Sequence, residues 1–261
     1  MSSGVRYEVR ERIAVITLDR APVRNALGPE EWQALAALVA RAASDSSVSV
    51  LLLAGEGGNF SAGGDLQTMP ERLALGPQER RAQLVRDAQA IRALVEFPRP
   101  VLAAIDGACM GAGLSLALAC DLRIASTRSR FGAVFHRVGL TGDFGLFHLL
   151  PRAVGLSRAT ELVMLAESID AARAEAFGLV QRLVPAEELE RESLALAARI
   201  SDGPPVAQRY SKMGLRRTFE LDLAAMIDWE AEAQAVCSRT ADVHEGLSAW
   251  AEKRAPRFRG Q

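Results

Sequence analysis

The stretch G-A-C-M-G-A-G-L-S-L-A-L-A-C-D, from Gly107 to Asp121, joins a turn of small residues to an apolar helix. It follows the apolar run P-V-L-A-A-I at 100–105, which has the length and composition of a buried strand. The first amides of a helix lack partners within it, and the helix dipole adds partial positive charge there. The pattern therefore predicts either a site for an oxyanion, with the Ala112 amide as a donor, or only close packing of helix and strand.

The composition predicts a soluble globular protein. The 261 residues are 49% hydrophobic and 24% charged, with a net charge of -1. There is no basic stripe and no apolar run long enough to span a bilayer, so we expect neither a nucleic-acid nor a membrane partner. The first residues lack the apolar core of a signal peptide, which favours a cytoplasmic protein. Three cysteines without paired spacing favour neither a disulfide framework nor a zinc site, and Cys109 and Cys120 are expected to be buried.

Apolar periodicity predicts an α/β chain with a second small-residue turn. Residues 7–19 favour a hairpin, and Pro29 starts a helix with one buried face. The run V-S-V-L-L-L-A at 48–54 has the character of a strand buried on both faces. The turn G-E-G-G-N-F-S-A-G-G-D-L at 55–66 leaves this strand as the first turn leaves its own. We therefore expect the two turns to converge on one site.

The second half of the chain is predicted to be mainly helical. Residues 77–97 show the spacing of one amphipathic helix, whereas 68–76 show no clear period. Residues 157–180 favour two helices joined by a turn. The segment S-D-G-P-P at 201–205 marks a boundary, after which we expect helix to about residue 255.

Asp143 is the acidic residue of a strongly apolar, glycine-flanked segment at 131–155. Burial against Phe144 and Leu146 would disfavour the charged carboxylate and raise its pKa toward that of a useful general base. Asp is also a favoured cap, so Asp143 could instead begin a helix at Phe144. The residues alone leave both interpretations open.

Taken together, these motifs resemble the crotonase superfamily, also called the enoyl-CoA hydratase/isomerase family. The segment N-F-S-A-G-G-D-L at 59–66 is similar to the family's first oxyanion loop, and residues 107–125 are similar to its second loop and helix. The segments G-L-V-Q-R-L-V-P at 178–185 and E-G-L-S-A-W-A-E-K-R-A-P-R-F at 245–258 follow in the expected order. The resemblance thus covers nearly the whole chain.

The resemblance implies a fold, an assembly and a ligand. The fold would be α/β, with a crotonase-like ββα spiral core at 1–200 and a helical C-terminal region at 201–261 that assembles a homotrimer or a hexamer. The substrate would be an acyl-CoA thioester, whose carbonyl oxygen accepts from the amides of Ala62 and Ala112. No cofactor or metal is implied beyond the coenzyme A of the substrate. The residues implied in coenzyme A binding are Arg24, Ala26, Leu27, Asp65, Leu66 and Phe258, the last perhaps supplied by a neighbouring subunit.

The resemblance also favours one reaction. Family hydratases carry two glutamates at the positions that here hold Ser115 and Phe135, and neither can act as a carboxylate base. Asp143 lies in G-L-T-G-D-F-G, which matches the G-L-x-x-D-x-G context of the acid/base of family isomerases, although Gly142 stands where these usually have proline. We therefore predict an enoyl-CoA isomerase that moves a double bond by proton transfer through an enolate.

Three alternatives stay open at this stage. The chain could be an enoyl-CoA hydratase despite the missing glutamates. Asp143 could attack the acyl-CoA as a nucleophile, as in family hydrolases and dehalogenases, and would then carry a covalent adduct during turnover. The chain could also bind CoA thioesters without catalysis.

Overall fold

The central sheet is built from the apolar runs of the sequence. The computed structural model describes residues 4–261. The central sheet has six strands in the order β1-β2-β3-β4-β6-β9. Strand β1 is antiparallel to β2, which confirms the predicted hairpin, and the other neighbours are parallel. The bounds are β1 Val5–Arg10, β2 Ile13–Leu18, β3 Val50–Gly55, β4 Val101–Ile105, β6 Leu122–Ser126 and β9 Arg182–Val184.

A second, smaller sheet alternates with the first along the chain. It consists of β5 (Ala108–Met110), β7 (Arg130–Gly132) and β8 (Ile169–Asp170), in the order β5-β7-β8. The chain passes from β4 to β5 and from β6 to β7, changing sheet each time. The stretch from Gly107 to Asp121 therefore contains a short strand, which the sequence prediction missed, before its helix α5 (Ala112–Ala119).

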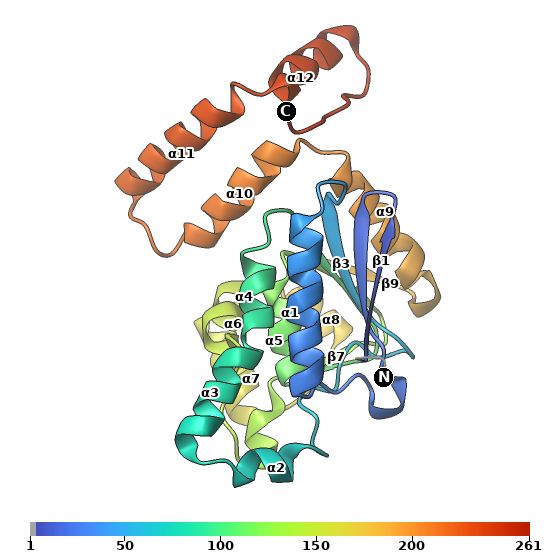
Figure 1. Ribbon diagram of the computed structural model, residues 1–261, viewed down its shortest axis with the longest axis vertical. Helices are drawn as coiled ribbons and strands as arrows, with labels where there is room; N and C mark the ends of the chain where they lie inside the picture. The colour runs from blue at the N-terminus through green and yellow to red at the C-terminus, as the bar shows by residue number, and fades with distance from the viewer. Residues whose placement is uncertain (1–3) are drawn as a thin grey trace.

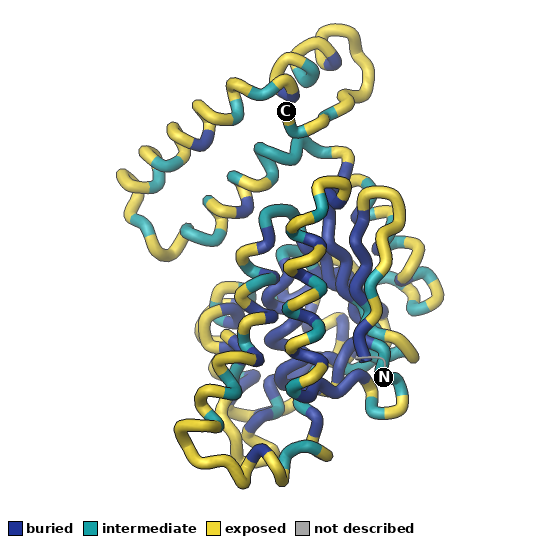
Figure 2. The backbone as a smooth tube through the Cα atoms, in the orientation of Figure 1, coloured by how far each residue is buried: buried dark blue, intermediate teal, exposed yellow. Residues whose placement is uncertain are grey.

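Both faces of the central sheet are covered. Ala14, Ile16, Leu51 and Leu53 pack in one hydrophobic cluster with helices that include α1 (Pro29–Ser44), α4 (Gln89–Val95) and α5. The alternate residues Ile13, Val15, Val50 and Leu52 pack against α9 (Leu189–Ser201) on the other face. Because successive side chains of a strand point to opposite faces, β3 is buried on both, as predicted. Figure 2 shows these strands as the most buried part of the molecule.

Helix α1 follows its predicted pattern. Trp32, Leu35, Val39 and Ala42, spaced by three and four residues, are all buried. Its start is fixed by Pro29 and by the Glu31 carboxylate, which accepts from the Gly28 amide at 2.8 Å. The helix thus presents Trp32 to the interior at the end of its first turn.

Two predictions between the loops are wrong. Residues 77–97 form not one helix but α3 (Pro77–Asp87) and α4, which part at Ala88. Ile91 and Leu94 of α4 are buried, whereas the only buried residue of α3 is Asp87, so the two segments do not share one apolar face. Residues 68–76 are also not irregular, because they contain the short helix α2 (Met69–Ala74).

The rest of the core carries shorter helices. After the 3₁₀ turn η2 (Val134–Val138), the chain forms α6 (Leu146–Val154), α7 (Leu156–Leu165) and α8 (Ala171–Ala176). Further 3₁₀ turns lie at Ala21–Val23 and Ala186–Glu188. Helices α7 and α8 confirm the two helices predicted for residues 157–180, and α6 precedes that region.

The last three helices form an arm that projects from the core (Figure 1). These are α10 (Pro205–Arg217), α11 (Leu223–Cys237) and α12 (Ala241–Glu252). The Asp121 carboxylate ties the arm to the core through Lys212 at 2.8 Å and Arg216 at 2.9 Å. Within residues 4–261, no helix has both the length and the apolar character needed to cross a membrane.

Candidate active site

The two small-residue loops lie side by side. Ser61 donates its amide to the Ala108 carbonyl at 2.8 Å, and the Met110 amide donates to the Ser61 carbonyl at 3.0 Å. A Cβ on Gly113 would lie 2.7 Å from Cβ of Ser61, closer than real side chains approach. Glycine at this position therefore lets α5 begin directly against the first loop. This arrangement confirms that the two turns converge.

Ala112 supplies an unpaired amide at the start of α5. The Gly111 amide donates to the Gly132 carbonyl at 2.8 Å, and the Ser115 amide closes the first turn on the Gly111 carbonyl at 3.1 Å. Among residues 4–261 the Ala112 amide has no acceptor. A first-turn amide of this kind can donate to an oxyanion.

The structure corrects the predicted donor in the first loop. The Ala62 amide donates to the Arg24 carbonyl at 2.8 Å, so it is not available to a ligand. Arg24 adopts a left-handed conformation, with a φ of 51°, next to Asn25 with a φ of 56°. This turn, 38 residues upstream of Ala62, engages the amide on which the prediction rested.

Gly64 carries the available amide instead. Leu27 forms a parallel bridge with Gly64, donating to the Gly63 carbonyl at 2.8 Å and accepting from the Asp65 amide at 3.0 Å. The Gly64 amide then points away from Leu27, and it has no acceptor in the described part of the chain. A Cβ on Gly63 would lie 3.4 Å from the Ala112 nitrogen, and one on Gly64 would meet open space. The two unpaired amides thus come from adjoining backbone.

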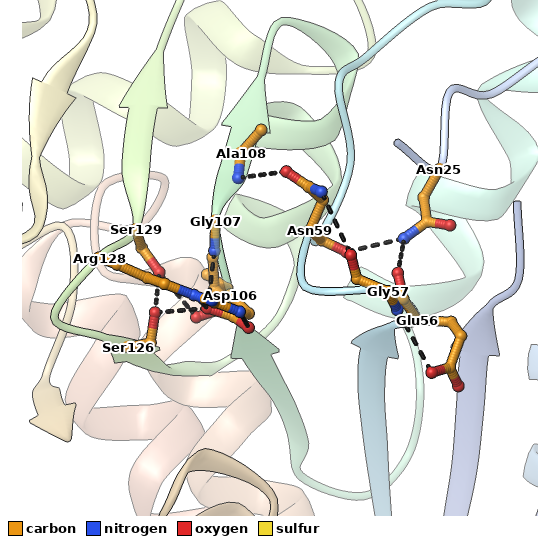
Figure 3. Close-up of polar contacts among 11 residues, drawn as sticks. Asn25, Glu56, Gly57, Asn59, Asp106, Gly107, Ala108, Ser126, Arg128 and Ser129 are labelled. Carbon is orange, nitrogen blue, oxygen red and sulfur yellow. Dashed lines mark hydrogen bonds and ion pairs between the residues drawn. The ribbon is translucent and has the colours of Figure 1, made fainter. Parts of the chain in front are cut away.

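Asn25 and Asn59 hold the first loop in place, and neither was singled out from the sequence. The side-chain amide of Asn25 donates to the carbonyls of Glu56 at 2.9 Å and Asn59 at 2.7 Å (Figure 3). The side-chain oxygen of Asn59 accepts from the Ala108 amide at 3.1 Å, which links the loop to β5. The hydrogen-bond partners of these two side chains are distant in the sequence, so the sequence alone does not reveal that they hold the loop.

Asp106 holds the start of the second loop. Its carboxylate accepts from the Gly107 amide at 2.9 Å, from the Ser126 hydroxyl at 2.6 Å and from Arg128 (Figure 3). Ser129 donates to the Ile105 carbonyl at 2.9 Å in the same cluster. The corner between β4 and β5 is therefore fixed by residues at the end of β6 and in the turn before β7.

Asp143 is half-buried, and one oxygen of its carboxylate lacks a protein partner. Its Oδ1 atom is buried and accepts no hydrogen bond from any described residue. Burial raises the pKa of Asp143 to about 7, against the opposing charges of Arg72 and Arg80. The alternative role as a helix cap is wrong, because α6 starts at Leu146 after Gly145 and has no side-chain cap.

Ser115 anchors the loop that carries Asp143. Its hydroxyl is buried and donates to the Asp143 backbone carbonyl at 3.0 Å. Ser115 lies one turn into α5, the helix that begins with the unpaired Ala112 amide. A single hydrogen bond therefore links the position of Asp143 to the helix that carries one of the amide donors.

Phe135, at the other position where family hydratases carry a glutamate, lies beside Gly111 in the turn before α5. Its ring is buried, and a Cβ on Gly111 would lie 3.9 Å from its Cε1 and Cζ atoms. An apolar ring at this place cannot hold or activate a water molecule. Ser115 and Phe135 thus leave the turn without a carboxylate of its own.

The residues predicted to bind coenzyme A divide into two groups. Arg24 is exposed, and 61% of Leu66 is exposed, so both are accessible near the first loop. Ala26 and Leu27 are buried, and the amide and carbonyl of each already take part in hydrogen bonds within the chain. The prediction for the Asp65 side chain is wrong, because its carboxylate is buried, pairs with Arg20 at 2.8 Å and accepts from the Gln67 amide.

Phe258 is not brought to these loops within one chain. It follows α12 and packs over Gly246, where a Cβ would lie 3.5 Å from its Cε1 atom. The C-terminal tail lies with the arm at the end of the molecule opposite α2, the helix that follows the first loop (Figure 1). A role for Phe258 in this site therefore requires a second chain and stays a prediction.

Two cysteines lie in the same part of the fold. Cys109 and Cys120 are free and buried, as expected, and burial raises the pKa of the Cys120 thiol to about 12. Among residues 4–261, no group of three or more His, Cys, Asp or Glu side chains is placed to hold a metal ion.

Comparison with known proteins gives matches along the whole chain. The profile of the family described as Enoyl-CoA hydratase/isomerase matches residues 8–261. The chain is 35% identical over 253 residues to the 2,3-dehydroadipyl-CoA hydratase of Escherichia coli, with 97% of each chain covered. It is 33% identical to a trans-2-decenoyl-acyl-carrier-protein isomerase of Streptococcus mutans, with 98% of each covered. The crystal structure of an enoyl-CoA hydratase from Bacillus anthracis is similar with a TM-score of 0.93 at 29% identity, covering 99% of this chain and 100% of that one.

Proposed function

Because the chain belongs to the enoyl-CoA hydratase/isomerase family, we propose that it is an isomerase that moves a double bond along the acyl chain of an enoyl-CoA. Processing of an acyl-CoA follows from the family. The choice of isomerisation rests on one observation, a half-buried Asp143 carboxylate with a free oxygen, held beside a turn from which both hydratase glutamates are missing.

The two unpaired amides would bind the thioester oxygen. Gly64 and Ala112 donate from adjoining loops, and Ala112 adds the positive end of the α5 dipole. Negative charge grows on this oxygen when a proton leaves carbon 2 of the acyl chain. Losing one donor of such a pair costs on the order of 3 kcal/mol in comparable sites, so the amides would supply a large part of the rate acceleration.

Asp143 would carry the proton. Its carboxylate takes a proton from carbon 2 of a 3-enoyl-CoA, and the electron pair delocalises into the thioester oxygen as an enolate. The protonated carboxyl then returns the proton to carbon 4, which leaves the double bond between carbons 2 and 3. A pKa of about 7 suits both steps, because the group is readily available in either form near neutral pH.

Hydration is the second candidate, and the names of several relatives favour it. Addition of water needs groups that activate the water and protonate carbon 2 of the acyl chain. Here Ser115 is engaged by a backbone carbonyl and Phe135 has no proton to exchange. Asp143 would have to serve both purposes, which makes isomerisation the simpler reaction for this set of residues.

Product analysis separates these reactions. The purified chain would be given 3-enoyl-CoA and 2-enoyl-CoA substrates of four to ten carbons, and the products identified by mass spectrometry. We expect interconversion of the two enoyl isomers, lost in Asp143→Asn and kept in Asp202→Asn, an exposed carboxylate outside the site. Formation of 3-hydroxyacyl-CoA without isomerisation would support hydration. A covalent adduct on Asp143 would show that it acts as a nucleophile.

The assembly is a second part of the proposal. The arm exposes large apolar side chains on three helices, among them Leu215, Leu223, Leu247 and Trp250. We propose that they are covered in a homotrimer or a hexamer, in which a neighbouring chain brings Phe258 to the coenzyme A moiety. Sedimentation velocity would give the mass of the assembly. A monomer at micromolar concentration would contradict the proposed assembly. It would not bear on the proposed reaction, which the product analysis tests separately.

We also keep a cytoplasmic location as an expectation from the sequence.

A further inference from the structure

The turn that follows Asp143 has an unusual backbone. The Leu146 amide donates to the Asp143 carbonyl at 3.1 Å, which closes a four-residue turn over 143–146. Both central residues are left-handed, with a φ of 52° at Phe144 and 81° at Gly145. Such a turn favours glycine, asparagine or aspartate at its centre, and a bulky side chain there strains the backbone. Phe144 therefore needs an interaction that keeps it in this conformation.

Trp32 of α1 supplies this interaction. The centroid of its ring lies 4.4 Å from that of Phe144, and the two ring planes are tilted by 32°. Trp32 is completely buried and Phe144 is 7% exposed. Two aromatic rings at this separation remove a large apolar area from water and attract each other. The contact between the rings therefore opposes the strain at Phe144.

The Trp32 side chain also has a buried polar atom without a partner. Its ring nitrogen donates no hydrogen bond to any described residue. A buried N–H group without an acceptor lowers stability, and a purely apolar ring would avoid this cost. An unpaired indole and a strained phenylalanine thus meet at one contact, next to Asp143. Unfavourable local features that occur together are typical of functional sites.

The backbone of this turn matters because hydrogen bonds do not orient the buried carboxylate oxygen of Asp143. This atom, Oδ1, has no donor among the described residues. The direction of the side chain is therefore set by the backbone that carries it. Ser115 holds that backbone through the Asp143 carbonyl, and the turn at Phe144 holds it on the C-terminal side.

Trp32 also connects the turn to the first loop. Its amide donates to the Gly28 carbonyl at 3.1 Å, in the first turn of α1. Leu27, immediately before Gly28, forms the parallel bridge with Gly64, which carries one of the two unpaired amides. The short segment 27–32 therefore contacts the loop of an oxyanion donor at one end and the turn of Asp143 at the other.

We propose that Trp32 is a positioning residue for Asp143. Its ring holds Phe144 in the left-handed turn and so sets where the Asp143 carboxylate lies relative to the Gly64 amide. The inference rests on the proposed function, in which Asp143 transfers the proton. Trp32 acts through Phe144 and takes no part in the proton transfer itself.

Substitutions of Phe144 separate positioning from packing. Phe144→Leu keeps a bulky apolar side chain but loses the ring contact, so the left-handed φ has no support. Phe144→Gly leaves a cavity, yet glycine adopts this φ without strain. We expect kcat for a 3-enoyl-CoA to fall at least about ten-fold in Phe144→Leu and less in Phe144→Gly, with KM within about three-fold in both. A purely structural role predicts the opposite order, because leucine preserves more of the core packing.

Substitutions of Trp32 test the other side of the contact. Trp32→Leu should reproduce the loss of kcat, whereas Trp32→Phe keeps an aromatic ring and should stay within about three-fold of the unmodified enzyme. Val39→Ala opens a cavity on the same buried face of α1, about two turns away, and should lose stability but not kcat. A kcat in Phe144→Leu equal to or above that in Phe144→Gly would overturn the inference.

Crystal structures of the variants give a readout that does not depend on turnover. In Trp32→Leu, residue 144 should leave the left-handed region and the Asp143 carboxylate should move by about 1 Å or more, the scale of misplacement that impairs catalysis. An unchanged turn in this variant would overturn the inference even if the enzyme is an isomerase. A relaxed turn in a chain that isomerises no enoyl-CoA would support the role of Trp32 and reject only the proposed reaction.

Discussion

Replacing Asp143 by asparagine should stabilise the protein at neutral and alkaline pH. The native carboxyl has a pKa raised from 3.8 to about 7 by burial. At 1.36 kcal/mol for each pKa unit, this corresponds to about 4 kcal/mol of unfolding free energy lost when the pH exceeds both values. The native state binds more protons than the unfolded state between about pH 4 and pH 7, so its stability falls as the pH rises through this window.

Asparagine at position 143 has no charge to bury and removes this dependence. Urea unfolding, followed by tryptophan fluorescence at one protein concentration, would give the free energies of both proteins at pH 5 and pH 8. The advantage of Asp143→Asn should grow by about 2 to 3 kcal/mol between these pH values. Asp202→Asn, at an exposed position, should show no such change. If the stability gained by Asp143→Asn does not depend on pH, or if the variant is less stable at pH 8, the inference that burial raises the pKa of Asp143 is refuted.

Three further predictions concern the site. Ser115→Ala removes the hydrogen bond to the Asp143 carbonyl and should lower kcat about five-fold with KM little changed, since one such bond contributes roughly 1 kcal/mol; an unchanged kcat with a raised KM would contradict this. Gly113→Ala would place a Cβ 2.7 Å from Ser61 and should lower kcat/KM more than 100-fold on the scale of a lost oxyanion donor, whereas Gly76→Ala, where the nearest atom is 3.6 Å away, should be active. The kcat/KM for a 3-enoyl-CoA should rise with pH to a plateau, with an apparent pKa near 7, because the free enzyme must hold Asp143 ionised to take the proton; a flat profile from pH 5 to 9 would exclude this base.

The elements that could be predicted are those whose signal is local. The three-and-four spacing of α1 and the doubly buried β3 are both found. The apolar surroundings of Asp143 also gave the correct direction of its pKa. These features depend on residues near one another in the chain, so a pattern in the sequence contains them.

The predictions that failed concern residues whose partners are distant in the sequence. The amide of Ala62 is engaged by a turn near residue 24, and Gly64 is freed by its bridge with Leu27. Small residues at 61–64 show that backbone can approach a ligand, but they do not show which amide points toward it. Asp65 was placed toward the ligand because nothing local reveals its partner Arg20.

A crystal structure with a bound, unreactive acyl-CoA tests the central claim most directly. The thioester oxygen should lie 2.7 to 3.1 Å from the amide nitrogens of both Gly64 and Ala112, the usual range for such donors. Oδ1 of Asp143 should lie about 3 to 3.5 Å from carbons 2 and 4 of the acyl chain. A thioester oxygen bound elsewhere, or an Asp143 carboxylate turned away from the chain, would contradict the account.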